Sequence, residues 1–331
     1  MIPRVERGSE IFPTARPVTP EERLIGRKAV IDSLEDEAIA HRTSLLLLEQ
    51  RRVGKTSLAR AVLSRHRRKD GLAFELDLSD TALAAPTHLS LELAAQARAA
   101  GVGVARGQAL AEKAVVAAKA AGGATRAIRG VLQIFDRQTD TTAGLGHAAD
   151  AFGEIETALG SFDATSPPAL AQVLEVLGAA ADHEEQPIVV FIDECQRLAA
   201  WEDAQHAVAH AMRRETNGLV FLFAGSDQTA LSQLFAIGKP LHHDGLRRRL
   251  PQISTDAWIP ALIARFGEAG IESTADDILA ILEASKGHPQ RTMQVCAHTR
   301  RWASDAGRTR LDEITIASGI ASAKEQPAWR L

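Results

Sequence analysis

One short segment, residues 44–60, constrains the fold more than any other part of the chain. It begins with the apolar run SLLLLE, which is typical of a strand buried on both faces of a parallel sheet. A helical pattern starts near residue 55, and the turn between the two carries a Gly-Lys-Thr-Ser run. Backbone N–H groups at such a helix N-terminus hold phosphates, a lysine neutralises the phosphate oxygens, and a hydroxyl binds Mg²⁺. The candidate phosphate contacts are Arg52, Val53, Gly54, Lys55, Thr56 and Ser57, with Thr56 also the candidate metal ligand.

The loop departs from the full phosphate-loop pattern at one position. Glu49 stands where the pattern G-x-x-x-x-G-K-[ST] has its first glycine. That glycine serves the turn that leaves the strand, so its loss is compatible with binding, although a carboxylate near a polyphosphate opposes it. The sequence leaves open whether Glu49 weakens nucleotide binding.

Two later apolar runs also end in polar side chains. PIVVFIDE at 187–194 ends in adjacent carboxylates, which is typical of the strand that supports the Mg²⁺ shell in phosphate-loop enzymes. Asp193 is therefore a candidate metal ligand, and Glu194 a candidate catalytic base that deprotonates an attacking water. After the run GLVFLFAG at 218–225, Ser226 is a candidate catalytic sensor of the γ-phosphate. The alternative is that Ser226 or its neighbour Asp227 caps a helix.

Strand and helix patterns alternate along the first two thirds of the chain, which predicts an α/β domain. The predicted strands are 44–49, 72–79, 187–193 and 218–225, and the predicted helices are 27–41, 55–67 and 202–215. Further helices are predicted at 256–268, 274–285, 289–304 and 311–323. The predicted fold class is α/β: a P-loop NTPase with a parallel sheet, helices on both faces, and a small all-helical lid domain after it. The predicted domains are an irregular lead-in on the surface at 1–22, a nucleotide domain at 23–249 and the lid at 250–331.

A long insertion interrupts the alternation at about 82–182. Its composition is dominated by alanine, which favours helix, although the segment 138–166 has a weaker pattern. An amphipathic membrane element is the alternative, but bulky apolar anchors and a strongly basic face are scarce here. We expect helices that pack on the sheet.

Composition excludes several classes of function. The 331 residues include no Tyr and only 10 Phe and 4 Trp, which excludes tyrosine chemistry and argues against a stacking platform for single-stranded nucleic acid. The formal net charge is -4, so any binding of DNA requires a local basic patch or an assembled oligomer. The two cysteines are widely separated, and the sequence has neither a signal-peptide run nor an apolar run of about 18 residues. We therefore expect a cytoplasmic protein without a membrane partner.

Other constellations have ordinary explanations. His206 and His210 have the i, i+4 spacing of metal-binding pairs, but no third ligand is evident, so a surface helix is favoured. Cys195 follows the carboxylates, where a buried thiol is a simpler reading than a nucleophile. The basic runs at 64–70 and 298–302 are typical of solvated helix ends, with DNA contact as the alternative.

Five features together resemble one known family. They are QRRVGKTSL at 50–58, LIGRKAVIDSL at 24–34, the strand ending in Asp-Glu, the strand followed by Gly-Ser, and KGHPQ at 286–290. In combination they resemble the archaeal-type ATPase group, near the STAND and origin-recognition branches of the AAA+ P-loop ATPases. The resemblance covers about residues 23–305. It implies an AAA+-like fold, with ATP and Mg²⁺ as the cofactors.

The resemblance also implies roles for further residues. Ile25, Gly26 and Arg27 fall where such proteins line the adenine pocket, and Pro289 falls where a GxP motif brings the lid to the nucleotide. Arg291 matches a second sensor, or else it is a solvent-facing helix residue. The arginines at 247–249 match an arginine finger for a neighbouring subunit, or else a solvated basic loop; Arg247 is the candidate catalytic residue.

These observations predict an ATP-binding, ATP-hydrolysing protein that does mechanical or regulatory work. One alternative is a nucleotide-gated switch or scaffold that does not hydrolyse ATP. Another is an ATP-dependent helper in a DNA transaction of the transposition or replication-initiation type. We expect a homo-oligomer or a protein partner, and the sequence leaves DNA binding, the pathway and the oligomer size open.

Overall fold

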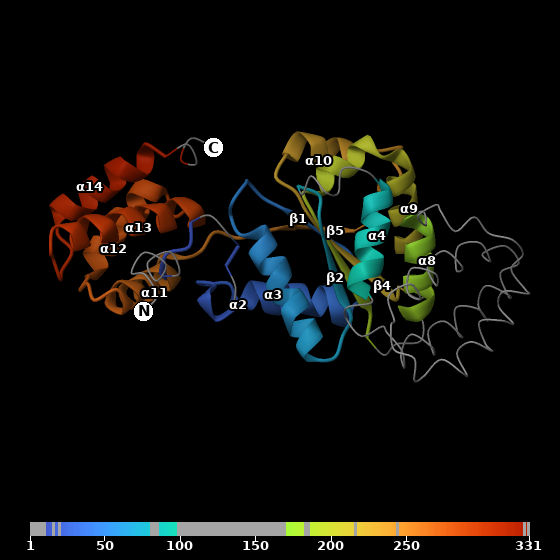
Figure 1. Ribbon diagram of the computed structural model, residues 1–331, viewed down its shortest axis with the longest axis horizontal. Coiled ribbons are helices and arrows are strands. Elements are labelled where there is room, and N and C mark those ends of the chain that lie inside the picture. Colours follow the sequence, from blue (N-terminus) through green and yellow to red (C-terminus); the bar gives the residue numbers. More distant parts are fainter. Residues whose placement is uncertain are drawn as a thin grey trace, which may run out of the picture. The chain divides into compact units, whose positions relative to one another are not determined.

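Figure 1 shows the computed structural model of the chain. It describes residues 11–14, 17–18, 21–79, 86–97, 170–181, 186–214, 217–242, 245–326 and 329. The chain divides into two compact units. The lid unit comprises Met1–Leu34, Glu49–Val62 and Arg249–Leu331, and the sheet unit comprises Glu35–Leu48 and Leu63–Arg248. The phosphate loop thus groups with the C-terminal helices, and the sheet forms a body of its own.

A five-stranded sheet in the order β2-β3-β4-β1-β5 forms the centre of the sheet unit. Its strands are β1 (Leu45–Leu48), β2 (Ala73–Asp77), β3 (Ile188–Asp193), β4 (Leu219–Ala224) and β5 (Leu246–Arg249). The pairs β2–β3, β3–β4 and β4–β1 are parallel. All six residues of β3 and all six of β4 are buried, as their continuous apolar sequences predict. The parallel sheet predicted for the first four strands is confirmed.

The edge strand β5 has no counterpart in the sequence prediction. Three of its four residues, Leu-Arg-Arg-Arg, are exposed, and the sequence has no apolar pattern. Backbone pairing holds it at the sheet edge: the Leu246 amide donates to the Ser44 carbonyl at 2.8 Å. A strand with exposed side chains gives no hydrophobic signal, so sequence periodicity misses it.

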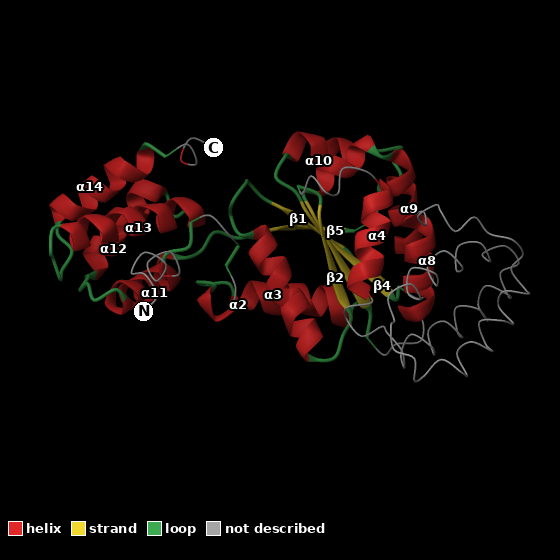
Figure 2. Ribbon diagram, in the orientation of Figure 1, coloured by secondary structure: helices red, strands yellow, loops and turns green. Residues whose placement is uncertain are grey.

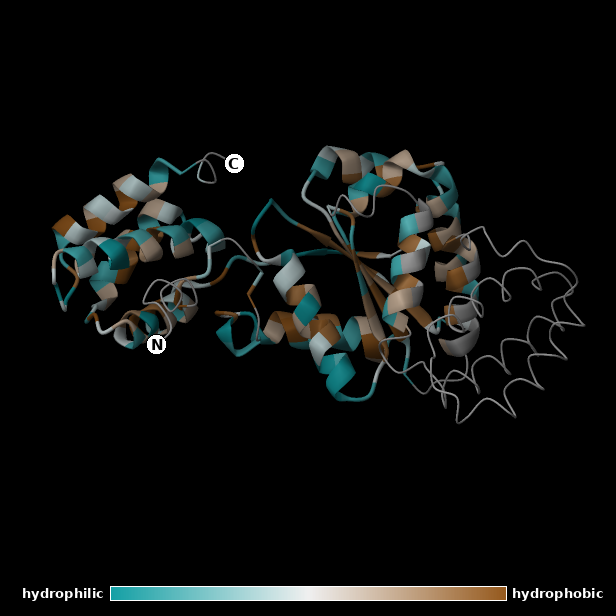
Figure 3. Cartoon of the chain, viewed as in Figure 1, coloured by the Kyte–Doolittle hydropathy of each residue, from teal (hydrophilic) through white to brown (hydrophobic). Residues whose placement is uncertain are grey.

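Helices cover the sheet and complete its core. Figure 1 shows α4 (Pro86–Ala97), α8 (Leu170–Ala181) and α9 (Glu202–Met212) together on one face. The helix α3 (Lys55–Arg68) follows β1 along the chain and has residues in both units. A short 3₁₀ helix, η5 (Cys195–Ala200), follows β3, and α10 (Gln228–Leu234) follows β4. Figure 3 shows the central strands of the sheet as mostly apolar. Two helices of the predicted insertion, α4 and α8, are confirmed, whereas residues 98–169, including the segment 138–166, lie outside the described residues.

The C-terminal part of the lid unit is helical, as predicted (Figure 2). Its helices are α11 (Thr255–Glu268), α12 (Ala275–Ser285), α13 (Pro289–Asp305) and α14 (Glu313–Lys324). Ser254 and His288 cap α11 and α13, and full capping boxes start α12 and α14. None of the helices in the described ranges is long and apolar enough to span a membrane.

The expectation that the lead-in lies on the surface is wrong for Phe12. Its side chain is 1% exposed and belongs to the core of the lid unit. The ring packs 4.9 Å from the ring of Phe266 in α11, measured between centroids. A single aromatic residue among prolines and charges carries no periodic signal, so its burial depends on the pocket that the helices form.

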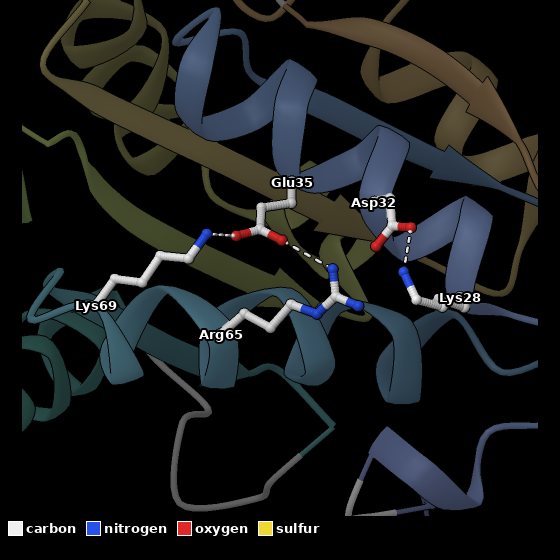
Figure 4. A network of polar contacts seen from close by, with 5 residues as sticks. All are labelled: Lys28, Asp32, Glu35, Arg65 and Lys69. Atoms are coloured by element: carbon white, nitrogen blue, oxygen red, sulfur yellow. Dashed lines mark hydrogen bonds and ion pairs between the residues drawn. The ribbon is translucent and has the colours of Figure 1, made fainter.

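A buried carboxylate joins two helices near the sheet. α2 (Lys28–Glu35) leads directly into a π-helical turn, η2 (Asp36–Ala40). At the junction Glu35 accepts hydrogen bonds from Arg65 at 2.9 Å and Lys69 at 2.5 Å (Figure 4). The Glu35 and Arg65 side chains are only 14% and 15% exposed. Burial by itself raises the pKa of Glu35, but the hydrogen bonds and charges of Lys69 and Arg65 outweigh it and lower that pKa below its ordinary value.

We expect Glu35→Gln to lower the free energy of unfolding by about 1–2 kcal/mol at pH 7, because it leaves Arg65 without its charged acceptor. A lowered pKa in the folded state stabilises the fold above the ordinary carboxylate pKa, and that contribution declines as pH falls below about 4.5. Urea unfolding of both proteins at pH 7 and near pH 3.5 measures the difference. Asp305→Asn removes an exposed ion pair with Arg301 and is the control, with a change near zero. A cost for Glu35→Gln that does not vary with pH contradicts the ionic explanation.

Candidate functional site

The predicted phosphate loop joins β1 directly to α3. Gly54 has a φ of 99°, in the left-handed region that glycine adopts without strain, and its carbonyl accepts the Leu58 amide as α3 begins. Lys55 is the first residue of α3 and is 7% exposed. Its ammonium group donates to the carbonyls of Glu49 at 2.8 Å and Gln50 at 2.7 Å. Lys55 therefore closes the loop on itself with its charge directed at the start of the loop.

Glu49 uses its carboxylate locally. Its Oε1 accepts the Gln50 amide at 3.0 Å. Burial lowers the pKa of Arg27, and the negative charge of Glu49 opposes that shift, which shows that the two charges interact. The guanidinium of Arg27, in a residue 5% exposed, donates to the Pro251 carbonyl at 2.6 Å and the Val53 carbonyl at 3.3 Å. A buried cation thus partly balances the carboxylate that replaces the first glycine of the loop.

The residues predicted to line an adenine pocket contact the start of α11. Ile25 packs against the core of the lid unit. Gly26 has a φ of 62°, and a Cβ there would lie 2.8 Å from the Ala257 Cβ. Arg27 holds Val53 and Pro251, as described above. The adenine contact itself stays a prediction.

His288 connects the lid helix α13 to the phosphate loop. Its Nδ1 accepts the Arg291 amide at 3.5 Å, so Nε2 carries the hydrogen and donates to the Arg51 carbonyl at 3.2 Å. Burial lowers the pKa of His288, and the charges of Arg291 and Arg52 lower it further. Pro289 follows as the first residue of α13, where its missing N–H costs nothing. The neutral imidazole is therefore the form that both contacts require.

Two further candidate residues, Ser57 in the loop and Arg291 in the lid, make contacts within the protein. Ser57 is 4% exposed, and its Oγ accepts the Val18 amide at 2.9 Å, so it anchors the lead-in. Arg291, the candidate second sensor, lies 5.6 Å from the centre of the Trp329 ring in a cation–π contact. Nothing in these contacts tests either predicted role.

The two carboxylates at the end of β3 occupy different environments. Asp193 is the last residue of β3 and is 8% exposed, and its Oδ1 accepts the Glu194 amide at 3.0 Å. Glu194 has φ 50° and ψ 39°, the left-handed conformation, which costs a non-glycine residue about 1–2 kcal/mol. The chain turns at Glu194 from β3 into the 3₁₀ helix η5.

Ser226 lies beside Glu194 and does not cap a helix. Its Oγ donates to Glu194 Oε2 at 2.7 Å. Asp227 is the N-cap of α10, with its side chain accepting the Ala230 amide at 2.9 Å. The structure thus decides the alternative that the sequence left open: Asp227 takes the structural position, and Ser226 reaches the candidate catalytic carboxylate.

Gln196, which the sequence analysis did not select, also contacts Glu194. Its Nε2 donates to the same oxygen, Oε2, at 2.5 Å. Its place two residues after Glu194 in a 3₁₀ turn brings the two side chains together. A polar residue two positions after an Asp-Glu pair is the signal available in the sequence, but it is too common to select one residue.

The predicted arginine finger belongs to β5. Arg247 is exposed and donates to the Phe235 carbonyl at 3.3 Å. Arg248 is held by Glu37 at 2.5 Å, and Arg249 is exposed at the end of the strand. The solvated-loop alternative is wrong for the backbone, because these residues form an edge strand. The finger role stays a prediction.

The constellations set aside in the sequence remain unremarkable in the structure. His206 is 64% exposed on α9 and lies 3.9 Å from Glu202. No group of three metal-binding side chains occurs among the described residues. Cys195 and Cys296 are both buried, and burial raises the pKa of the Cys296 thiol, which disfavours the reactive thiolate.

The candidate residues of the sheet unit lie at one edge of the sheet by topology. β1, β3 and β4 are parallel, so their carboxyl ends lie at the same edge. The phosphate loop follows β1, Asp193 and Glu194 come at the end of β3, and Ser226 follows β4. β4 lies between the other two strands and carries Ser226 next to Glu194.

Solved structures share this fold. A Walker-type ATPase of Pyrococcus abyssi matches with a TM-score of 0.60 and 16% identity, over 95% of this chain and 75% of that one. The ORC2 protein of Aeropyrum pernix, solved in ADPNP–ADP complexes, matches with a TM-score of 0.55 and 14% identity over 96% and 72%. The ORC1 protein of Aeropyrum pernix, solved with DNA, gives 0.52 and 13% over 96% and 69%. The chain has the fold of the archaeal-type AAA+ P-loop ATPases.

These likenesses concern the fold. No family model and no curated protein matches the sequence. With identities of 13% to 16%, activity and ligands have to be argued from this chain's own residues.

The His288 contacts predict a pH-dependent stability. We expect His288→Ala to lower the free energy of unfolding by about 1 kcal/mol at pH 8, through loss of the α13 cap. Because the folded-state pKa is lowered, the histidine stabilises the fold fully above about pH 6.5 and progressively less as pH falls below it. His288→Asn keeps a capping acceptor and is expected to lose less than alanine at pH 8. Urea unfolding between pH 5 and 8 measures both, and an alanine cost that is constant across this range rejects the neutral-imidazole assignment.

Proposed function

We propose that the chain binds ATP with Mg²⁺ and hydrolyses it to ADP and phosphate. The observation that carries this proposal is the Glu194 carboxylate, which is held beside Ser226 at the edge of the sheet from which the phosphate loop also starts. The AAA+ fold and the nucleotide complexes of the ORC2 relative support it. In this proposal the nucleotide is held by Lys55, the α3 N-terminus and Thr56.

The oxygen donors suit Mg²⁺. Thr56 offers a half-buried hydroxyl in the first turn of α3, and Asp193 offers a carboxylate that is 8% exposed at the end of β3. Hydroxyl and carboxylate oxygens are the ligands that Mg²⁺ takes alongside nucleotide phosphates. When bound, Mg²⁺ would neutralise charge on the phosphate oxygens.

The proposed reaction is an in-line displacement. A water oxygen bonds to the γ-phosphorus, the bond from that phosphorus to the β–γ bridging oxygen breaks, and ADP leaves with the electron pair. Glu194 orients the water and accepts its proton on Oε1. In this proposal Lys55 balances charge on the transferred group, and the Ser226 hydroxyl shifts its hydrogen bond from Glu194 to the γ-phosphate or the water.

Regulatory or mechanical work would use the lid contacts. His288 and Arg27 both bond to carbonyls of the phosphate loop, at Arg51 and Val53, and both lie in the same unit as the lid helices. A loop that reshapes around nucleotide changes the positions of those carbonyls. These contacts therefore give nucleotide binding a direct route to α13 and to the segment before α11.

We expect Glu194→Gln to retain ATP binding, with a Kd within about threefold of wild type, because the amide keeps the size of the side chain. Phosphate release should fall by about 100-fold or more, because the amide accepts no proton. A fluorescent ATP analogue and a phosphate-release assay measure the two quantities. Glu202→Gln, at a glutamate 83% exposed on α9, is the matched control with unchanged turnover. Undiminished turnover in Glu194→Gln rejects the catalytic assignment, and ATP binding without turnover in the wild type at any concentration favours the non-hydrolysing switch.

Arg247 is proposed as a finger supplied to a neighbouring copy. If so, turnover per subunit rises with protein concentration, and Arg247→Ala lowers the turnover at high concentration by up to about 10³-fold without changing ATP affinity. Arg249→Ala, at the other exposed arginine of β5, is the comparison. Turnover that is independent of concentration and unaffected by Arg247→Ala removes the finger proposal.

A further inference from the structure

The Glu194 carboxylate is held through one of its two oxygens. Gln196 Nε2 and Ser226 Oγ both donate to Oε2, at 2.5 Å and 2.7 Å. Within the part of the chain that the structure describes, Oε1 accepts no hydrogen bond. The place of the carboxylate therefore depends on its two donors.

The two donors differ in how firmly they are fixed. A serine hydroxyl has one hydrogen and rotates to suit whichever acceptor is present. The Gln196 amide is confined: a Cβ added to Gly225 would lie 2.4 Å from its Oε1, so the amide lies against bare backbone at the end of β4. Gly225 thus makes room for Gln196, and Gln196 in turn bonds to Glu194.

The orientation of the amide follows from charge. Turning it over would place Oε1 against the Glu194 carboxylate, and two acceptors repel at that distance. The Nε2 donor must therefore face Glu194, even though this leaves Oε1 of Gln196 buried and without a hydrogen-bond partner among the described residues. A buried carbonyl without a donor destabilises the fold, and the charge-assisted bond to Glu194 offsets that cost.

We propose that Gln196 is a positioning residue for Glu194. Its amide lies against Gly225 and keeps Glu194 Oε2 in place when the Ser226 hydroxyl shifts its hydrogen bond from Glu194 to the nucleotide. The other oxygen, Oε1, then accepts the proton of the attacking water. This inference rests on the proposed hydrolysis, since it assigns how the base of that reaction is oriented.

The test is Gln196→Met, which keeps the length and packing of the side chain but removes the donor. We expect kcat to fall by about tenfold, because a misplaced base meets the water less often, while the KM and the directly measured Kd for ATP stay within twofold. Gln233→Met, at an exposed glutamine on α10, is the control for the exchange itself and is expected to leave kcat unchanged. Unchanged or raised kcat in Gln196→Met overturns the proposal, as does a loss of ATP affinity that accounts for the whole effect.

Gly225→Ala gives an independent measurement. Its methyl group would displace the Gln196 amide, so it should lower kcat by a similar factor while Kd is kept. Combining it with Gln196→Met should add little, because both changes remove the same contact. Multiplicative losses in the double variant overturn the proposal. If Gly225→Ala does not fold, as judged by circular dichroism, the Gln196→Met result decides alone.

The outcomes separate this inference from the proposed function. Wild-type protein that binds ATP without releasing phosphate, across protein concentrations, removes the hydrolysis proposal and this one with it. Wild-type turnover that Glu194→Gln abolishes but Gln196→Met does not change removes only the role of Gln196.

Discussion

The pairing of β4 with both β1 and β3 is the constraint on which the sheet unit depends. All six residues of β4 are buried, so the strand is covered on both faces. Because the three strands are parallel, their carboxyl ends are brought to one edge. That edge is where the phosphate loop starts and where the catalytic candidates Glu194 and Ser226 meet, although 32 residues separate these two in the sequence.

In the lid unit the organising contacts are made to backbone carbonyls of the phosphate loop. Arg27 bonds to Val53, and His288 bonds to Arg51. Burial lowers the pKa of both side chains. The two differ in consequence, because an arginine stays charged in proteins, whereas a lowered pKa favours the neutral form of a histidine. A charged arginine and a neutral histidine thus bond to the same loop. Of these two contacts, that of His288 depends on pH between about 5 and 8.

Much of the fold could be predicted from local pattern. The helices at 27–41 and 289–304 and the strands at 187–193 and 218–225 were recognised because their apolar residues repeat with the period of the element or run continuously. β5 was missed because an exposed edge strand carries no such repeat. Phe12 was misplaced because its burial depends on helices more than two hundred residues away in the sequence.

For this chain, the sequence by itself determined the types of the elements and the chemistry available at their ends: a Gly-Lys-Thr turn after one strand, two carboxylates after another, and a serine after a third. Only the tertiary structure decided which of these side chains meet. It assigned the helix cap to Asp227 and the carboxylate contact to Ser226, and it brought Gln196 to Glu194 because Gly225 leaves room for the amide. The reason is physical: propensity and periodicity act over a few neighbouring residues, whereas a hydrogen bond between side chains depends on where strand pairing places their backbones.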